Sequence, residues 1–122
     1  MTLRDDSYKH RFREPGQEIL SPALLAASLE VSGGQLAAVL GVHHDVMRHH
    51  PDDPTVQRRL GELAEVFGRL LELRADPATA AFHMKNTPVA ILNHRTLFEA
   101  VATHDSERAV RYLQSISGGQ SG

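Results

Sequence analysis

The chain contains no cysteine and no tryptophan, and aromatic residues make up 5% of it. Without cysteine there are no disulfides and no thiolate chemistry, which is typical of a cytosolic protein. No apolar run approaches the ~18 residues that a membrane-spanning helix needs. The N-terminal segment carries charges of both signs and lacks the apolar core of a secretory signal. We therefore expect a cytoplasmic protein that does not associate with a membrane.

The chain also lacks an excess of positive charge. The formal net charge is −2, whereas a free-standing DNA-binding protein is usually basic because phosphate contacts supply much of its affinity. DNA binding by this chain would therefore need a local basic patch, a dimer or a basic partner.

Signals for the beginnings of helices are dense, whereas signals for strands are weak. No stretch alternates apolar and polar residues over about six positions, as a half-exposed strand would. Instead, Ser, Thr or Asp stands before proline or before apolar residues spaced three and four apart, which is how helices begin. The length of 122 residues fits one domain or two very small ones. The sequence thus predicts an all-α protein.

Seven helices are expected in two groups, joined by one long helix. The two groups cover residues 20–50 and 76–117, and the long helix covers 54–74. The helices are expected to begin at about residues 22, 34, 43, 54, 77, 97 and 106, with a short apolar turn at 89–92. Thr96 and Glu99 are spaced as a capping box, and Asp105 or Ser106 is expected to cap the last helix. Phe82 is expected to face the core. The long helix would span roughly 30 Å and connect the two groups.

Residues 35–48 have the pattern of a helix-turn-helix motif. Small Ala37 or Ala38 allows close packing, Gly41 suits the turn, and polar residues follow in the next helix. The predicted DNA-binding residues are His43, His44, Arg48, His49 and Arg58. The second helix is short and contains Asp45, and only its arginine can read a base bidentately. A helical hairpin that serves packing alone stays open as an alternative.

The histidine cluster of residues 43, 44, 49 and 50 raises the possibility of a metal site. Only Asp45 and His49 have the i, i+4 spacing of helical zinc ligands, so we expect a solvated face or phosphate contacts instead of a metal. The chain shows no Gly-rich phosphate loop after a strand, no G-x-S-x-G and no HExxH. We therefore expect no catalytic residue, no cofactor and no enzymatic activity.

The C-terminal third carries a resemblance to a known family. The segment 82–101, FHMKNTPVAILNHRTLFEAV, is followed by Val110, Leu113, Ile116 and Gly118. It resembles the toxin-binding domain of Xre/MbcA/ParS antitoxins, which has an aromatic residue, a proline break, a leucine before a short polar loop, a capped helix and a last helix of V-x-x-L-x-x-I type. The chain departs from the family at Phe82, where Trp is common, and at Leu97, where many members have Pro. With the upstream motif and the long helix, the resemblance covers about residues 20–119.

The resemblance implies an antitoxin that neutralises a RES-domain toxin, an NAD-consuming or ADP-ribosylating enzyme, by covering its NAD pocket. It also implies autoregulation through operator DNA bound together with the toxin, and a homodimer or hetero-oligomer. The toxin-binding residues expected from it are Asn93, His94, Arg95, Gln114, Ser117, Gly118 and Gly119. The alternatives are a stand-alone helix-turn-helix transcription regulator and a structural helical domain without a toxin.

This interpretation divides the chain into five parts. They are a flexible arm (1–17), an Xre-like helix-turn-helix domain (18–53), a long connecting helix (54–74), a helical toxin-binding domain (75–119) and a disordered tail (120–122). Tyr8 and Phe12 lie four residues apart in the arm, which leaves open one amphipathic turn that docks on a partner.

Overall fold

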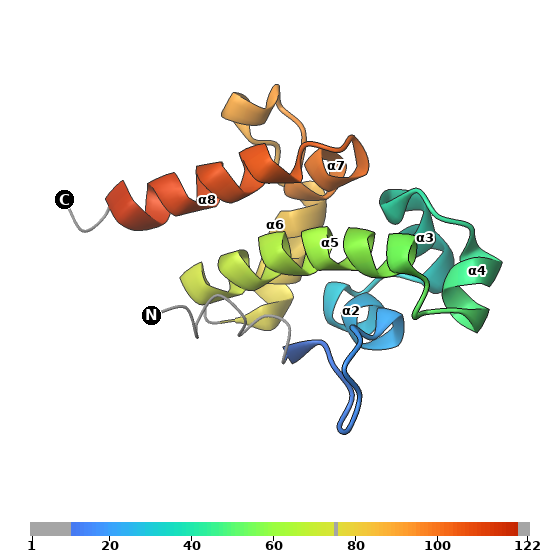
Figure 1. The fold of residues 1–122 in the computed structure, drawn as a ribbon. Helices are drawn as coiled ribbons and strands as arrows, with labels where there is room; N and C mark the ends of the chain where they lie inside the picture. Colours follow the sequence, from blue (N-terminus) through green and yellow to red (C-terminus); the bar gives the residue numbers. More distant parts are fainter. Residues whose placement is uncertain (1–10, 75, 120–122) are drawn as a thin grey trace.

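Helices make up nearly all of the regular structure (Figure 1). The computed structural model describes residues 11–74 and 76–119, and within these ranges it contains seven α-helices, one short 3-10 helix and no strand. The predicted all-α class is confirmed. The elements are α2 (Pro22–Leu29), α3 (Gly33–Leu40), α4 (His44–His49), α5 (Pro54–Leu73), α6 (Pro77–Asn86), η2 (Ala90–Leu92), α7 (Leu97–Ala102) and α8 (Ser106–Gly119).

Side-chain caps fix where the helices begin. The Ser21 hydroxyl accepts a hydrogen bond from the Leu24 amide, and Asp53 and Asp76 cap α5 and α6 in the same way. The predicted capping box of Thr96 and Glu99 is present at α7, and a second box begins α3. Each cap stabilises its helix by about 1 kcal/mol, so these starts follow from local sequence alone.

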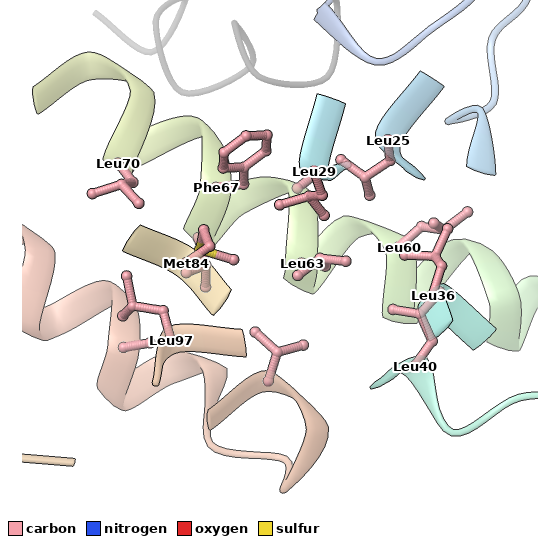
Figure 2. Close-up of a cluster of buried hydrophobic side chains, with 14 of the residues drawn as sticks. Leu25, Leu29, Leu36, Leu40, Leu60, Leu63, Phe67, Leu70, Met84 and Leu97 are labelled. Carbon is pink, nitrogen blue, oxygen red and sulfur yellow. The ribbon is translucent and has the colours of Figure 1, made fainter. Parts of the chain in front are cut away.

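Helix α5 is the central element of the fold. Its 20 residues span about 30 Å, and Figure 1 shows the other helices arranged around it. It packs against α3, α6, α7 and α8. Leu60, Leu63, Phe67 and Leu70 lie on its buried face, amid side chains from α2, α3 and α6 (Figure 2).

One hydrophobic cluster runs through the whole described structure. Helix α2 packs on α6 and α3 packs on α7, so the predicted regions 18–53 and 75–119 contact each other directly as well as through α5. The long helix therefore serves as a shared core and does not merely connect two groups.

Arg59 of α5 is buried in this core, with 2% of its surface exposed. Its Nε donates to the Leu40 carbonyl at 2.8 Å, and its Nη2 donates to the Val101 carbonyl at 2.8 Å. Its Nη1 pairs with Glu62. Leu40 ends α3, which precedes α5 in the chain, and Val101 lies in the last turn of α7, which follows α5. One guanidinium therefore hydrogen-bonds to carbonyl groups near the ends of both helices.

The segment before α2 is also part of the core. Phe12 is fully buried, and its ring stacks on Phe67 with centroids 5.8 Å apart. The Ser21 amide donates to the Phe12 carbonyl at 2.7 Å, and Arg13 and Leu20 form an antiparallel bridge. Residues 11–17 therefore differ from the predicted flexible arm, because the buried phenyl ring and the backbone hydrogen bonds together hold this segment in place. The remainder of the arm, residues 1–10, and the tail 120–122 lie outside the described residues.

The prediction that Phe82 faces the core is wrong, because its side chain is 61% exposed. Helix α6 buries Ala80, Ala81 and Met84 instead. Positions 80 and 84 lie one turn apart on the inner face, and at 100° per residue position 82 lies on the opposite side. The small alanines allow α6 to approach α5 and α2 closely, which leaves no room for a phenyl ring.

Within the described ranges, no single helix has both the length and the hydropathy needed to cross a membrane. Only α2 and α3 taken together reach that hydropathy, and a bend of 103° separates them.

Candidate protein-binding site

A closed loop precedes α7. The Val89 amide donates to the Arg95 carbonyl and the His94 amide donates to the Val89 carbonyl, each at 2.9 Å. Helix η2 lies inside this loop, and its Leu92 is fully buried. The loop is therefore fixed by backbone hydrogen bonds at its neck and by an apolar anchor within it.

Arg95 ties this loop to the start of α8. Its Nε donates to the Leu92 carbonyl at 2.7 Å, and its two terminal nitrogens donate to the Thr103 hydroxyl and the Asp105 carboxylate at 2.5 Å each. The hydrogen bond from Arg95, with the nearby charges of Arg95 and Arg108, holds the pKa of Asp105 below its usual value of 3.8. The guanidinium predicted as a toxin contact is thus engaged within the chain, where it positions the loop.

The loop presents two exposed residues in an uncommon backbone conformation. Asn93 has φ 62° and His94 has φ 65°, the left-handed region that costs a non-glycine residue about 1–2 kcal/mol. Two such residues in succession persist because Leu92 and Arg95 on either side are held in place. Their side chains are therefore presented to solvent from a rigid support.

Two large apolar side chains are exposed in the same part of the chain. Phe82 on α6 and Ile91 on η2 are each 61% exposed, and they are nine positions apart in the sequence. Ile91 was not among the predicted binding residues, because the apolar run VAIL at 89–92 predicts uniform burial. The exposure of Ile91 could have been predicted from the three-residue spacing of Val89 and Leu92. These two side chains are buried, and Ile91 between them is exposed.

The other predicted toxin-binding residues lie at the far end of α8. Gln114 and Ser117 are exposed, and Gly118 and Gly119 close the helix. Leu113 is buried and Ile116 is half-buried, which holds this end of α8 beside α5 (Figure 1). Since Asp105 joins the 89–95 loop to the beginning of α8, the two groups of predicted residues are separated by about 15–20 Å along the helix axis.

A small cavity of about 140 Å³ lies beneath this end of α8, and Leu70, Leu73, Arg74, His83, Tyr112 and Ile116 line it. The Nε2 atom of His83 is buried there and has no hydrogen-bond partner among the described residues. Burial, with a contribution from the charge of Arg74, lowers the pKa of His83 below 6.5.

The predicted DNA-binding residues lie near the α3–α4 turn. Gly41 has φ 68° in this turn, and His43 caps α4 by accepting from the Asp45 amide at 3.3 Å. His44, Arg48 and His49 are exposed on α4. Arg58 is on α5, where its guanidinium lies 3.6 Å from Glu62. Among the described residues, no three His, Asp or Glu side chains are placed to hold a metal ion.

No family model, no curated protein and no solved structure matches this chain. The residues and their geometry are therefore the basis of any functional proposal.

Proposed function

We propose that the chain is an antitoxin of the Xre/MbcA/ParS type, which acts in the cytoplasm by binding a RES-domain toxin and covering its NAD pocket. The observation that carries this proposal is the 89–95 loop. It keeps Asn93 and His94 in strained, exposed conformations while Arg95, which would be free in an ordinary surface loop, braces it from within. Strain of this kind persists where the surrounding structure over-determines the backbone, and it is concentrated at functional sites.

The exposed groups suit an inhibitor. Binding energy at protein interfaces comes mostly from a few apolar or aromatic anchors, and a surface that is already ordered loses little entropy on association. Ile91 and Phe82 are exposed anchors, and Asn93 and His94 supply polar groups from the rigid loop. An inhibitor that acts by occupying a pocket needs no catalytic group of its own.

The end of α8 forms the second part of the proposed site. Gln114 and Ser117 are exposed and two glycines follow, so this tip is narrow enough to enter a cleft. The two parts lie at opposite ends of α8, and we propose that the toxin contacts both along the helix. Variants in each part can therefore be tested separately.

The experiment is co-expression with a RES-domain toxin, followed by affinity pull-down and an NAD-consumption assay. The wild type is expected to form a stable complex and to silence the activity. Ile91→Ser and His94→Gly are each expected to weaken inhibition at least tenfold. Glycine tolerates the left-handed backbone at position 94, so the variant removes the imidazole without forcing a different turn. Val46→Ser, at an exposed apolar position on α4, is the matched control. Full inhibition by both loop variants would refute the loop as the site.

A truncation tests the α8 tip. Removing residues 114–122 leaves buried Leu113 in place, so the helical content measured by circular dichroism should fall only by the residues removed. Neutralisation is expected to be lost. If the truncated chain still inhibited the toxin fully, the tip would be excluded from the site.

DNA binding is the second candidate, and the short turn between α3 and α4 favours it. Gly41 permits this turn, and His44, Arg48 and His49 project from the following helix, as in a helix-turn-helix. An operator complex, formed by the chain alone or with the toxin, should weaken steeply with salt. Replacing Arg48 and Arg58 together by Ala should weaken it further. The absence of a mobility shift with promoter DNA at low salt, with and without the toxin, would exclude this activity.

A further inference from the structure

We propose that a cleft between α2, α4 and the segment before α2 binds a small aromatic carboxylate. This α2–α4 cleft has a volume of about 440 Å³, within the range of about 300–1,000 Å³ that is typical of small-molecule sites. Its polar lining comes from Glu14, Ser21, His44 and Arg48, and its other lining residues, among them Gly33, are small or apolar. The proposal is independent of the toxin-binding surface, because none of the residues of that surface lines the cleft.

The cleft is apolar on one side because its residues there are small or lack polar side-chain groups. Ala23 and Ala26 of α2 leave space that longer side chains would fill, and Pro22 and Pro51 border them. Met47, which is 4% exposed, contributes a flexible thioether that adapts to the shape of a ring and packs favourably against it. A flat apolar body of one or two rings suits such a surface.

Arg48 of α4 supplies the positive charge that lines the cleft. His44 and Arg48 are separated by one helical turn and both line the cleft, so they project from the same face. In the described part of the chain, no carboxylate pairs with Arg48, and its one side-chain contact is His49 Nε2 at 3.5 Å. A guanidinium with unused donors beside an apolar surface is a bidentate site for a carboxylate.

The polar groups on the other wall are already paired. The Ser21 hydroxyl donates to the Glu14 carboxylate at 3.2 Å and accepts from the Leu24 amide at 3.1 Å. Glu14 repels a second carboxylate, so it directs the anionic end of a ligand toward Arg48 and leaves the ring over the alanines. Arg48 therefore favours an aryl monocarboxylate over a neutral compound with the same ring system.

The test uses 2-naphthoate as the probe and neutral 2-naphthamide as its matched control, with binding to the full chain followed by ¹H–¹⁵N NMR. We expect saturable binding of 2-naphthoate, with shifts at the amides of Ala23, Gly33 and Met47, and at least tenfold weaker binding of the amide. Saturable shifts elsewhere in the chain, equal binding of the two compounds, or no saturation at millimolar concentration would overturn the proposal.

Two variants test the two halves of the cleft. Arg48→Gln removes the cation and Ala23→Leu fills the apolar side, and each is expected to weaken 2-naphthoate binding at least tenfold. Both positions are exposed on helices, and an unchanged spectrum away from the cleft confirms that the variants fold. Arg111→Gln and Ala78→Leu, at exposed positions on α8 and α6, are the matched controls and should bind as the wild type does. Wild-type affinity in both cleft variants would refute the site.

Discussion

At the scale of single residues, Arg59 shows how a buried charge can organise a small core. Burying a cation is costly unless each donor finds an acceptor. The guanidinium meets the carbonyl groups of Val39, Leu40 and Val101 and the Glu62 carboxylate. It therefore links α3, α5 and α7 through carbonyl groups near the ends of α3 and α7.

Arg59→Met is accordingly expected to lower the free energy of unfolding by about 1–3 kcal/mol, because it leaves the Leu40 carbonyl, buried at the end of α3, without its donor. The adjacent Arg58→Met is the matched control. Arg58 is exposed, so its effect should stay within about 0.5 kcal/mol. Urea unfolding followed by circular dichroism measures the free energy of unfolding of both variants. Equal decreases in the two variants would contradict this role for Arg59.

The same residues show what the sequence could reveal. The Thr96–Glu99 capping box was predictable because its two members are three positions apart and need no tertiary partner. The role of Arg59 was not predictable, because its acceptors lie 19 and 42 positions away. Phe82 was predicted to be buried from its hydrophobicity, but the alanines and Met84 of α6 already provide an inner face.

At the scale of elements, the 89–95 loop depends on a residue outside it. Arg95 reaches Asp105, at the start of α8, so the loop and α8 form one unit. The sequence predicted that Asp105 or Ser106 caps α8. The Asp105 carbonyl does accept from the Ala109 amide at 3.2 Å, but the Asp105 side chain binds Arg95. A capping pattern could not show this second partner, because the hydrogen bond requires the tertiary position of the loop.

Asp105→Ala is expected to loosen the loop without unfolding the chain. Hydrogen exchange at the amides of Val89 and His94, which close the neck of the loop, should become at least tenfold faster, while the amides of α5 keep their protection. Glu107→Ala, at an exposed position in the first turn of α8, should leave the exchange rates of the loop amides and of the α5 amides unchanged. Unaltered exchange in the Asp105 variant would show that the loop does not need its link to α8.

The ion pair between Arg95 and Asp105 makes the stability of the folded chain depend on pH. The pKa of Asp105 in the folded chain is below 3.8, so the carboxylate stabilises the fold above that pH. This contribution is lost as the pH falls through the folded pKa. At neutral pH Asp105 is therefore ionised, and its ion pair with Arg95 stabilises the loop.

His83, which lines the cavity beneath the end of α8, predicts a second dependence of stability on pH, at milder pH. Burial lowers the pKa of His83 below 6.5, so the unfolded chain takes up a proton before the folded chain does. Stability should therefore fall as the pH decreases from 7.5 to 5.5. The loss of stability over this pH range, measured as the shift of the urea midpoint, is expected to be smaller in His83→Leu than in the wild type. His94→Gln, at an exposed position, is the control and should retain the full slope. An equally steep fall in the His83 variant would exclude His83 as its source.

At the scale of the whole molecule, the helices were predictable and their packing was not. Apolar spacing and caps located the helices to within a residue or two at most ends, because these signals are local. The contacts of α2 with α6 and of α3 with α7 join segments about 50 or more residues apart, and one apolar face does not identify its partner. The sequence therefore favoured two groups joined by a helix, whereas the structure has one continuous core.

A continuous core predicts cooperative unfolding. If α3 and α7 share buried contacts across α5, then amides in 33–40 and in 97–102 should lose their native NMR signals at the same urea concentration. Arg59→Met should lower both midpoints equally, because Arg59 bonds to the end of α3 and to α7. Two separate transitions, or a shift confined to one group of amides, would mean that the N-terminal and C-terminal helices are independent units. Coincident transitions would instead mean that a change at either proposed binding surface is felt through α5 by the stability of the whole chain.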